Sequence, residues 1–207
     1  MYTPKYARND NVDELKEFIR AHGFGILFTG SGGKPWATHI PMVLSRDGSR
    51  LTGHVSRANL QWKVFQTGEV VLAVFAGPHT YISSSWYDHE NVPTWNYIAV
   101  HVSGTIRVIE GEAIITHLKE LTRQYEVHSA NPVSVEKMTP KFLETEMRGL
   151  VAFEIEISEI EGARKLSQNR DDKNHDIIIE NLENRADEDS HMIAQEMKKN
   201  RPQKDGN

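Results

Sequence analysis

The sequence contains no cysteine. This absence excludes disulfides, thiolate zinc sites, iron–sulfur clusters held by thiolates and cysteine nucleophiles. Long apolar runs are also missing, because no segment approaches the roughly 20 residues that a membrane span requires. The first residues, Met1–Tyr6, are too polar for a signal peptide. We therefore expect a cytoplasmic protein that does not enter a membrane.

A surplus of positive charge is equally absent. The 207 residues include 24 Lys and Arg against 29 Asp and Glu, which gives a net charge of −5. Residues 1–162 carry 15 basic against 19 acidic side chains, and residues 163–207 carry 9 against 10. Neither part is basic, so neither has the electrostatic footprint of a nucleic-acid-binding domain. DNA is a possible partner that the charge does not support.

Aromatic residues are missing from the end of the chain. Every Trp, Tyr and Phe precedes Ala163. A segment without aromatics packs a poor core by itself. Its apolar residues recur at helical spacing around Ile178–Leu182 and Met192–Met197. We predict a domain over residues 1–162, followed by a C-terminal helical extension over residues 163–207.

The pattern of the first 162 residues predicts mainly strands. Apolar runs bounded by turn residues predict strands over 25–29, 36–44 and 51–56 as a meander, then 70–76, 95–109 and 150–157. A break at Gly77-Pro78 precedes a shorter extended run over 80–83. Helical spacing predicts a first helix that begins at Val12 and is ended by Gly23, a second over 114–125, and a short one near 60–65. Without regular β-α-β alternation, this pattern favours a mainly β fold with peripheral helices, a small six-stranded antiparallel barrel.

The densest polar segment is His54-Val55-Ser56-Arg57-Ala58-Asn59, where a strand gives way to a short helix. A hydroxyl, a guanidinium, a carboxamide and backbone N–H groups near a helix start suit an anion, and Arg can hold a phosphate bidentately. Ser and Asn are also ordinary capping residues, so a structural role is the competing interpretation.

A second segment, Thr38-His39-Ile40-Pro41, places a His and a Pro inside a strand. Because Pro lacks a backbone donor, it belongs at an edge or an interrupted ladder, and such an interruption leaves neighbouring backbone groups free for a ligand. The competing interpretation is an edge strand that faces solvent.

Two further segments combine rings or hydrogen-bond donors. Residues 81–87 and 92–97 hold clustered aromatics, hydroxyls and Asn96, which can stack on a flat ring and bond to its edge, or can simply belong to the core. Residues 164–170 are dense in donors and follow the last strand, where a polar linker is the alternative.

Common catalytic signatures are absent. The sequence has no Walker loop, no Gly-x-Gly-x-x-Gly and no Gly-x-Ser-x-Gly. His39, His54, His79 and His101 lie in or near strands, and no pair has the His-x-x-x-His spacing of a helical metal site. We therefore predict no metal site and assign no catalytic residue.

Taken together, these segments resemble the PaiB family, the FMN-binding negative transcriptional regulators also described as protease synthase and sporulation proteins. The resemblance begins at Met1–Tyr6 and continues through Ala37–Pro41, Gly53–Asn59 and Gly77–Ser83. Pro93–Tyr97 and Lys165–Arg170 complete it, so it spans nearly the whole chain. Ordered peptides of this length are far more specific than single short motifs.

The resemblance implies the FMN-binding split barrel and a homodimer with the flavin at the subunit interface. It assigns ring contacts to the second strand and phosphate contacts to Ser56-Arg57, although the related oxidases carry an additional phosphate-binding Arg where Ala37 or a neighbour stands here. The residues expected to bind FMN are Thr38, His39, Ile40, Pro41, His54, Val55, Ser56, Arg57, Asn59, Trp95, Asn96, Lys165, Ser167, Gln168 and Asn169.

Three functions follow from the resemblance. The first is regulation of sporulation and degradative-enzyme genes, acting indirectly because no DNA-binding element stands out. The second is a flavin-dependent oxidoreductase acting on a small molecule, in which His39 or His54 would donate a proton. The third is haem binding, since some split-barrel relatives bind haem, although no single His stands out as the axial ligand.

Overall fold

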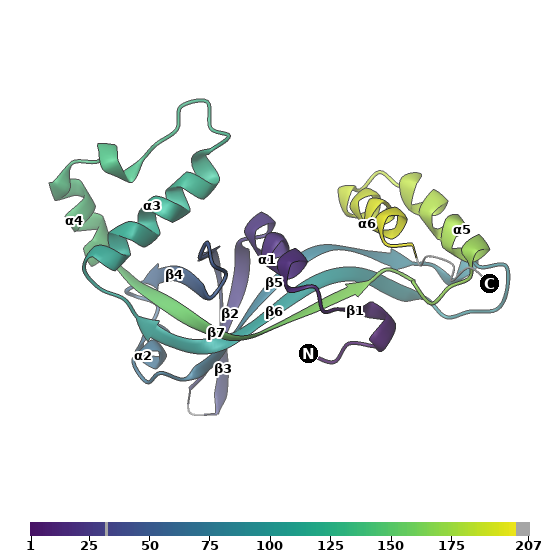
Figure 1. Cartoon of the computed structure of the whole chain (residues 1–207), viewed down its shortest axis with the longest axis horizontal. Coiled ribbons are helices and arrows are strands. Elements are labelled where there is room, and N and C mark those ends of the chain that lie inside the picture. Colours follow the sequence, from purple (N-terminus) through teal and green to yellow (C-terminus); the bar gives the residue numbers. More distant parts are fainter. Residues whose placement is uncertain (32, 202–207) are drawn as a thin grey trace. The chain divides into compact units, whose positions relative to one another are not determined.

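A computed structural model describes residues 1–31 and 33–201 (Figure 1). Within this part of the chain the strands are β1 (Arg8–Asn9), β2 (Phe24–Ser31), β3 (Lys34–Leu44), β4 (Arg50–Ser56), β5 (Val70–Ile82), β6 (Thr94–Val108) and β7 (Leu150–Lys165). The α-helices are α1 (Val12–Ala21), α2 (Trp62–Phe65), α3 (Glu112–Glu126), α4 (Pro140–Arg148), α5 (Asp172–Glu183) and α6 (Glu188–Lys199). None of the described helices is both long and apolar enough to cross a membrane.

The strands form one antiparallel sheet in the order β1-β7-β4-β3-β2-β5-β6, with a further pairing of β7 to β6. The mainly β class with peripheral helices is confirmed, and so is the meander of β2, β3 and β4. The described residues hold seven strands, whereas six were predicted. The additional strand, β1, is two residues long and pairs Arg8 with Ala163.

The predicted break at Gly77-Pro78 is wrong, because β5 runs without interruption from Val70 to Ile82. The pairing explains why a proline is tolerated there. Strand β2 pairs with β5 only at residues 72–74. At Pro78, β5 therefore has no β2 partner among the described pairings. A residue without a backbone donor can occupy a position where one edge of the strand is unpaired.

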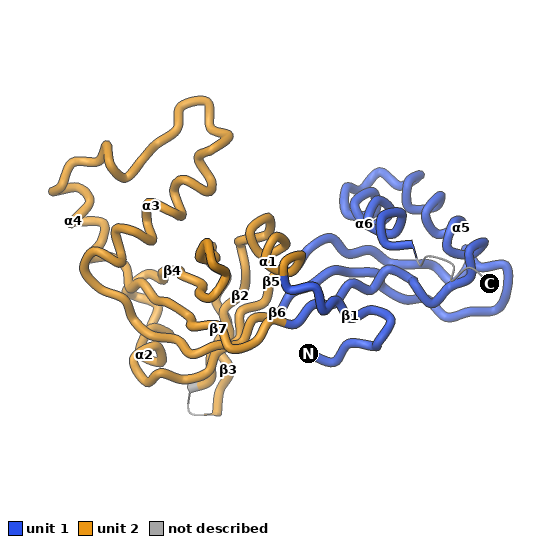
Figure 2. Tube along the Cα trace, viewed as in Figure 1, with its two compact units in different colours: residues 1–12, 76–100, 161–207 blue, residues 13–75, 101–160 orange. Residues whose placement is uncertain are grey.

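The described chain divides into two compact units (Figure 2). Unit 1 comprises residues 1–12, 76–100 and 161–207, of which 202–207 lie outside the described residues. Unit 2 comprises residues 13–75 and 101–160. Strands β5, β6 and β7 contribute residues to both. The separation of a domain at 162 from an extension at 163 stays a prediction.

In unit 1 the predicted tail helices form as α5 and α6, each capped by an aspartate. The side chain of Asp171 accepts a hydrogen bond from the Asn174 amide, and that of Asp187 accepts one from the Ser190 amide. Both helices bury aliphatic side chains, among them Ile178, Leu182, Ile193 and Met197. The segment without aromatics thus gains its core by packing within unit 1, as its composition requires.

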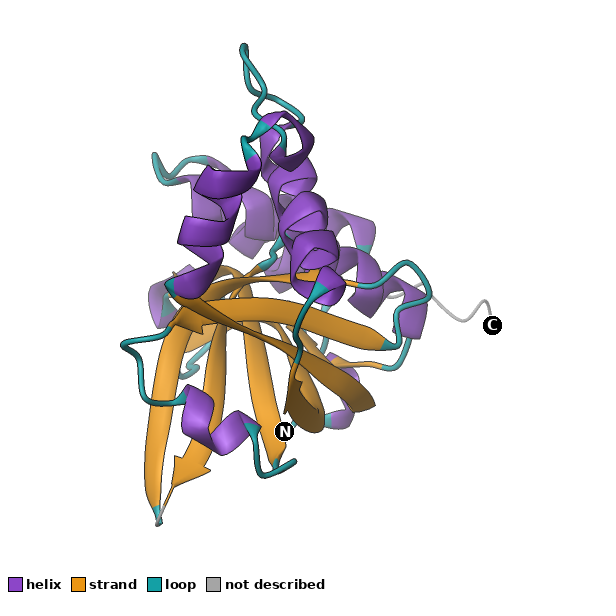
Figure 3. Cartoon of the chain, turned by 90° about the vertical axis from the view of Figure 1, so that its left-hand side faces the viewer, coloured by secondary structure: helices purple, strands orange, loops and turns teal. Residues whose placement is uncertain are grey.

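The strands form a strongly curved sheet (Figure 3). In unit 2 their side chains alternate between the core and the outward face, as β4 shows. Strand β4 buries Leu51, Gly53 and Val55 and turns the residues between them outward. Phe153 on β7 is fully buried and meets Phe65 edge to face, with ring centroids 5.0 Å apart. A Cβ atom at Gly53 would lie 2.5 Å from the Phe153 ring, so glycine makes room for it.

Helix α3 is joined to the outward face of β4 by a chain of three side chains. Nδ1 of His54 lies 3.0 Å from Nε2 of His117, and Nδ1 of His117 lies 3.0 Å from the hydroxyl of Thr52. His117 is 1 % exposed. Desolvation, and secondarily the charge of His54, lowers the pKa of His117 to about 4, and burial also lowers the pKa of His54. Both rings are therefore neutral near pH 7.

Replacing Phe153 by alanine is expected to lower the free energy of unfolding by about 3–5 kcal/mol, because it leaves a cavity beside Phe65. Phe142 on α4 is 52 % exposed and supplies the matched control, since Phe142→Ala should cost less than about 1 kcal/mol. Urea unfolding of the two variants measures both values. Equal losses would contradict the assigned core.

The neutral His117 makes stability depend on pH. Its folded pKa lies below the 6.5 of the unfolded chain, so its contribution is complete above pH 6.5 and is lost as the pH falls towards 4. The loss is on the order of 3 kcal/mol. Urea unfolding at several pH values should show a shallower pH dependence for His117→Gln than for the wild type. The exposed His128→Gln should keep the wild-type slope.

Candidate functional site

The predicted ring-binding segment lies on a strand that is paired on one side only. Strand β3 pairs with β2 along residues 34–41, but β4 joins β3 only at residues 42–44. On the β4 side, the described pairings therefore leave the backbone of residues 34–41 unpaired. Pro41 stands where this open edge ends, which agrees with the interrupted ladder that its missing donor predicts.

The four residues of this segment have different environments. Ile40 is 6 % exposed and belongs to the core. His39 is exposed and stacks on Phe24, with ring centroids 6.4 Å apart. Thr38 and Pro41 are half-buried. A ligand at the open edge would therefore meet the backbone, Thr38 and His39, whereas Ile40 supports the strand from within.

Thr38 is joined to the turn after β4 through two carboxamides. The Asn59 side chain donates to the Thr38 hydroxyl at 3.0 Å, and that hydroxyl donates to Oε1 of Gln61 at 2.5 Å. Nε2 of Gln61 in turn donates to the Leu27 carbonyl and to the Thr29 hydroxyl, at 3.2 and 3.1 Å. The structure thus brings together Thr38 and Asn59, two predicted site residues that are 21 positions apart.

Gln61 is a positioning residue that the sequence interpretation missed. It is fully buried, and in the sequence it stands between the apolar residues Leu60 and Trp62. Its signal was its position directly before the apolar residues of α2, where a side chain points into the core. A buried carboxamide must find partners, and Gln61 finds them on β2 and β3.

Two of the three guanidinium nitrogens of Arg57 donate hydrogen bonds to backbone carbonyls. Nε donates to the carbonyl of Arg148 at 2.8 Å, and Nη2 donates to the carbonyl of Leu150 at 2.9 Å. Arg57 therefore fastens the turn after β4 to the junction of α4 and β7. No hydrogen bond from its remaining nitrogen, Nη1, occurs among the described residues, and the side chain is exposed.

The backbone amides of this turn are also occupied. The amide of Ala58 donates to the Ser56 hydroxyl, that of Asn59 to the Ser56 carbonyl, and that of Arg57 to the Gly149 carbonyl. Helix α2 is a single turn. The donors that the turn can offer a phosphate are thus those of its side chains.

His54 and Val55 have contrasting roles on β4. Val55 is 3 % exposed and packs in the core. His54 is half-buried and bonded to His117, and together with Ser56 it lines a cavity of about 540 Å³ between β4, α3 and α4. Leu118, Met138 and Phe142 supply its apolar wall.

The remaining predicted residues lie in unit 1, where they form a cluster of their own. Asn96 is fully buried, and its Oδ1 accepts a hydrogen bond from the Ser167 hydroxyl at 3.0 Å. Lys165 donates to the Thr94 hydroxyl at 2.5 Å, and burial, then Arg170, lowers its pKa. Trp95 is 52 % exposed.

The loop that follows Lys165 is held mostly by its own bonds. Gln168 accepts from the Leu166 amide at 2.8 Å and donates to the Arg164 carbonyl. Ser167 has a φ of 59°, a left-handed conformation that its buried hydroxyl bond supports. Asn169 is exposed. Ser167 and Gln168 thus shape the loop, and Asn169 is exposed on it, as Trp95 is on β6.

Comparison with known proteins agrees with this architecture. Residues 1–159 match the family model described as "Putative FMN-binding domain". The chain is 42% identical over 199 residues to the protease synthase and sporulation protein PAI 2 of Bacillus subtilis, covering 95% of this chain and 96% of that protein.

Solved structures with little sequence identity share the fold. The FAD and heme binding protein of Mycobacterium smegmatis aligns with a TM-score of 0.60 at 16% identity, over 77% of this chain and 73% of that one. The flavocytochrome Anf3 of Azotobacter vinelandii aligns with a TM-score of 0.57 at 16% identity, over 84% and 78%. The fold is therefore that of the flavin-binding split barrels, and the chain belongs to the PaiB family.

Proposed function

We propose that this chain is a homodimeric FMN-binding protein that acts as a negative regulator of sporulation and protease genes without binding DNA itself. The proposal that the cofactor is FMN rests on the open edge of β3 beside the Thr38–Asn59–Gln61 network. The family membership and the relative named for protease synthesis and sporulation support the role.

The chemistry of the open edge suits a flavin ring. Backbone N–H and C=O groups on this edge alternate, except at Pro35 and Pro41, which have no N–H. The pyrimidine portion of an isoalloxazine also alternates donors and acceptors, so it can bond to such an edge. Thr38 and the exposed ring of His39 border this edge. When bound, FMN would supply redox chemistry, whereas the protein would hold and orient the ring.

The phosphate is expected near the turn after β4. The donors available there are Nη1 of Arg57, the Ser56 hydroxyl, which accepts from Ala58 but can still donate, and the second amide hydrogen of Asn59. One guanidinium nitrogen does not neutralise a dianion. This shortage supports a second chain that completes the site.

Exposed aromatic residues support a homodimer at this edge. Phe24 is 62 % exposed on β2, and Trp36 is 39 % exposed on β3. Large apolar side chains that border an unpaired strand edge are costly to leave in water, and the edge itself invites another chain. A second copy would cover the rings and enclose the flavin.

The regulatory role is proposed as indirect because the charge argues against a DNA interface. The chain carries a net charge of −5, and DNA-binding proteins gain most of their nonspecific affinity from basic side chains on phosphates. Regulation would then pass through another protein or a small ligand.

Titration with FMN tests the cofactor. We expect quenching of FMN fluorescence at saturation, and Arg57→Ala should weaken binding by about 1–3 kcal/mol, roughly 5- to 150-fold, if Nη1 bonds the phosphate. Because Arg57 also fastens the α4–β7 junction, the free energy of unfolding is measured in parallel. The exposed Arg123→Ala is the matched control and should bind like the wild type. No quenching with wild-type protein would reject the cofactor, and unchanged affinity in Arg57→Ala would reject this contact.

Light scattering tests the proposed homodimer, and a gel-shift assay tests whether the chain binds DNA. We expect the mass of a dimer, and no retardation of protease-gene promoter DNA even at low salt, where nonspecific binding is strongest.

Deleting the gene in its host should raise the transcripts of extracellular proteases. A retarded band at low salt would replace indirect regulation with direct repression, and unchanged transcripts would remove the regulatory role.

A further inference from the structure

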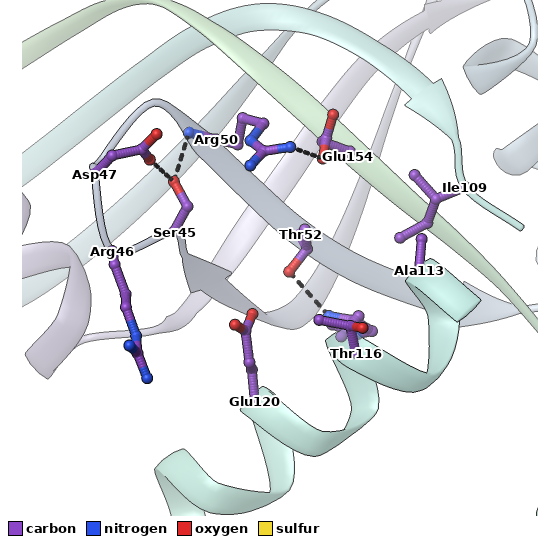
Figure 4. Close-up of a pocket in the computed structure, with 11 residues that line it drawn as sticks. Ser45, Arg46, Asp47, Arg50, Thr52, Ile109, Ala113, Thr116, Glu120 and Glu154 are labelled. Carbon is purple, nitrogen blue, oxygen red and sulfur yellow. Dashed lines mark hydrogen bonds and ion pairs between the residues drawn. The ribbon is translucent and has the colours of Figure 1, made fainter. Parts of the chain in front are cut away.

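Unit 2 contains a second polar cavity that the flavin proposal does not use. It has a volume of about 520 Å³ and lies between the β3–β4 turn, the outward face of β4 and helix α3 (Figure 4). A volume of this size admits a small metabolite. The side chains that line it are Ser45, Arg46, Asp47, Arg50, Thr52, Ile109, Ala113, Thr116, His117, Glu120 and Glu154.

Most polar groups of the cavity are already satisfied by one another. The Asp47 carboxylate accepts from the hydroxyls of Ser45 and Ser49, and these bonds lower its pKa to about 2. The hydroxyl of Thr116 donates to the carbonyl of Glu112. Thr52 and His117 bond each other at 3.0 Å, and the neutral imidazole adds no charge to the cavity floor.

The buried carboxylate of the cavity is also paired. Glu154 is 7 % exposed, and two arginines hold it. Arg107 donates to Oε1 at 2.7 Å, whereas Arg50 donates to Oε2 at 3.2 Å through Nη1 alone. Within the described part of the chain, this is the only side-chain bond that Arg50 makes.

Two charged side chains of the cavity have no partner among the described residues. These are the guanidinium of Arg46, on the β3–β4 turn, and the carboxylate of Glu120, on α3. Figure 4 shows the Glu120 carboxylate directed from α3 towards the turn and β4. Both residues line the cavity, yet no ion pair joins them. At its other end, Ile109 and Ala113 give the cavity an apolar wall.

The charges of the cavity select the class of ligand. Arg107 is counted with the cavity because it pairs with Glu154. The three basic groups and the three acidic groups then balance, namely Arg46, Arg50 and Arg107 against Asp47, Glu120 and Glu154. A dianion or a polyamine would leave one sign uncompensated, whereas a zwitterion leaves none. We propose that this cavity binds a free α-amino acid, with its carboxylate on Arg46, its ammonium group on Glu120 and its side chain towards Ile109 and Ala113.

The test screens the twenty proteinogenic amino acids, one at a time, by ligand-observed NMR on the full chain. We expect at least one to bind with a Kd below about 1 mM, the weak range of small metabolites. For that amino acid, the analogue without the amino group and the analogue without the carboxyl group should each bind at least tenfold more weakly. The ¹⁵N resonances of the His117 ring should shift on binding, because this ring forms part of the cavity wall.

Variants locate the site. Glu120→Gln and Arg46→Gln should each weaken binding at least tenfold, whereas Glu112→Gln, an exposed position on the same helix, should not. FMN titration of the same variants should give wild-type affinity, so failure here is separate from failure of the flavin proposal. The proposal is overturned if none of the twenty binds, if the deaminated analogue binds as well as the amino acid, or if the His117 resonances stay unchanged.

Discussion

The early separation of β4 from β3 is the constraint on which the candidate site depends. Strand β3 is eleven residues long, but β4 pairs with only its last three. A fully paired β3 would have no free backbone groups and no place for the polar turn at 56–59. Because β4 pairs with β3 only through residues 51–53, although it pairs with β7 as far as Ser56, the first part of β3 becomes an edge inside a sheet of seven strands. The site follows from this pairing rather than from any single side chain.

Such an edge must be held in place, and buried polar side chains hold it. Gln61 bonds to β2 and β3 at once, so the short α2 is fixed against the edge that it borders. Buried carboxamides are costly when unpaired, which makes this network specific for one arrangement of the turn. Asn96 has the same function in unit 1, where it joins β6 to the loop at Ser167 and to Met197 on α6.

Local patterns predicted most elements of the fold. The helical stripe of α1, the alternation of β4 and the aliphatic spacing of α5 and α6 each depend on neighbours within a few residues. The sequence failed where the outcome depends on distant partners. Pro78 reads as a break until the one-sided pairing of β5 is known. For Arg57 the phosphate contact stays a prediction, but nothing in the sequence indicated that two nitrogens of its guanidinium bond carbonyls more than ninety residues away. The spacing of apolar residues along the sequence does not reveal hydrogen bonds between such distant residues.

The alternation of β4 joins the two proposed sites physically. Arg50, Thr52, His54 and Ser56 share its outward face, since successive side chains point to opposite sides of a strand. The first two line the cavity proposed for an amino acid, and the last two lie beside the turn proposed for the flavin phosphate. Between them, His117 bonds Thr52 with one nitrogen and His54 with the other. If Thr52 donates to His117, the imidazole must donate to His54, and if Thr52 accepts, His54 must donate. A ligand that recruits the Thr52 hydroxyl therefore decides which nitrogen of His54 carries its proton, and this exchange would link the site proposed for an amino acid to the site proposed for the flavin.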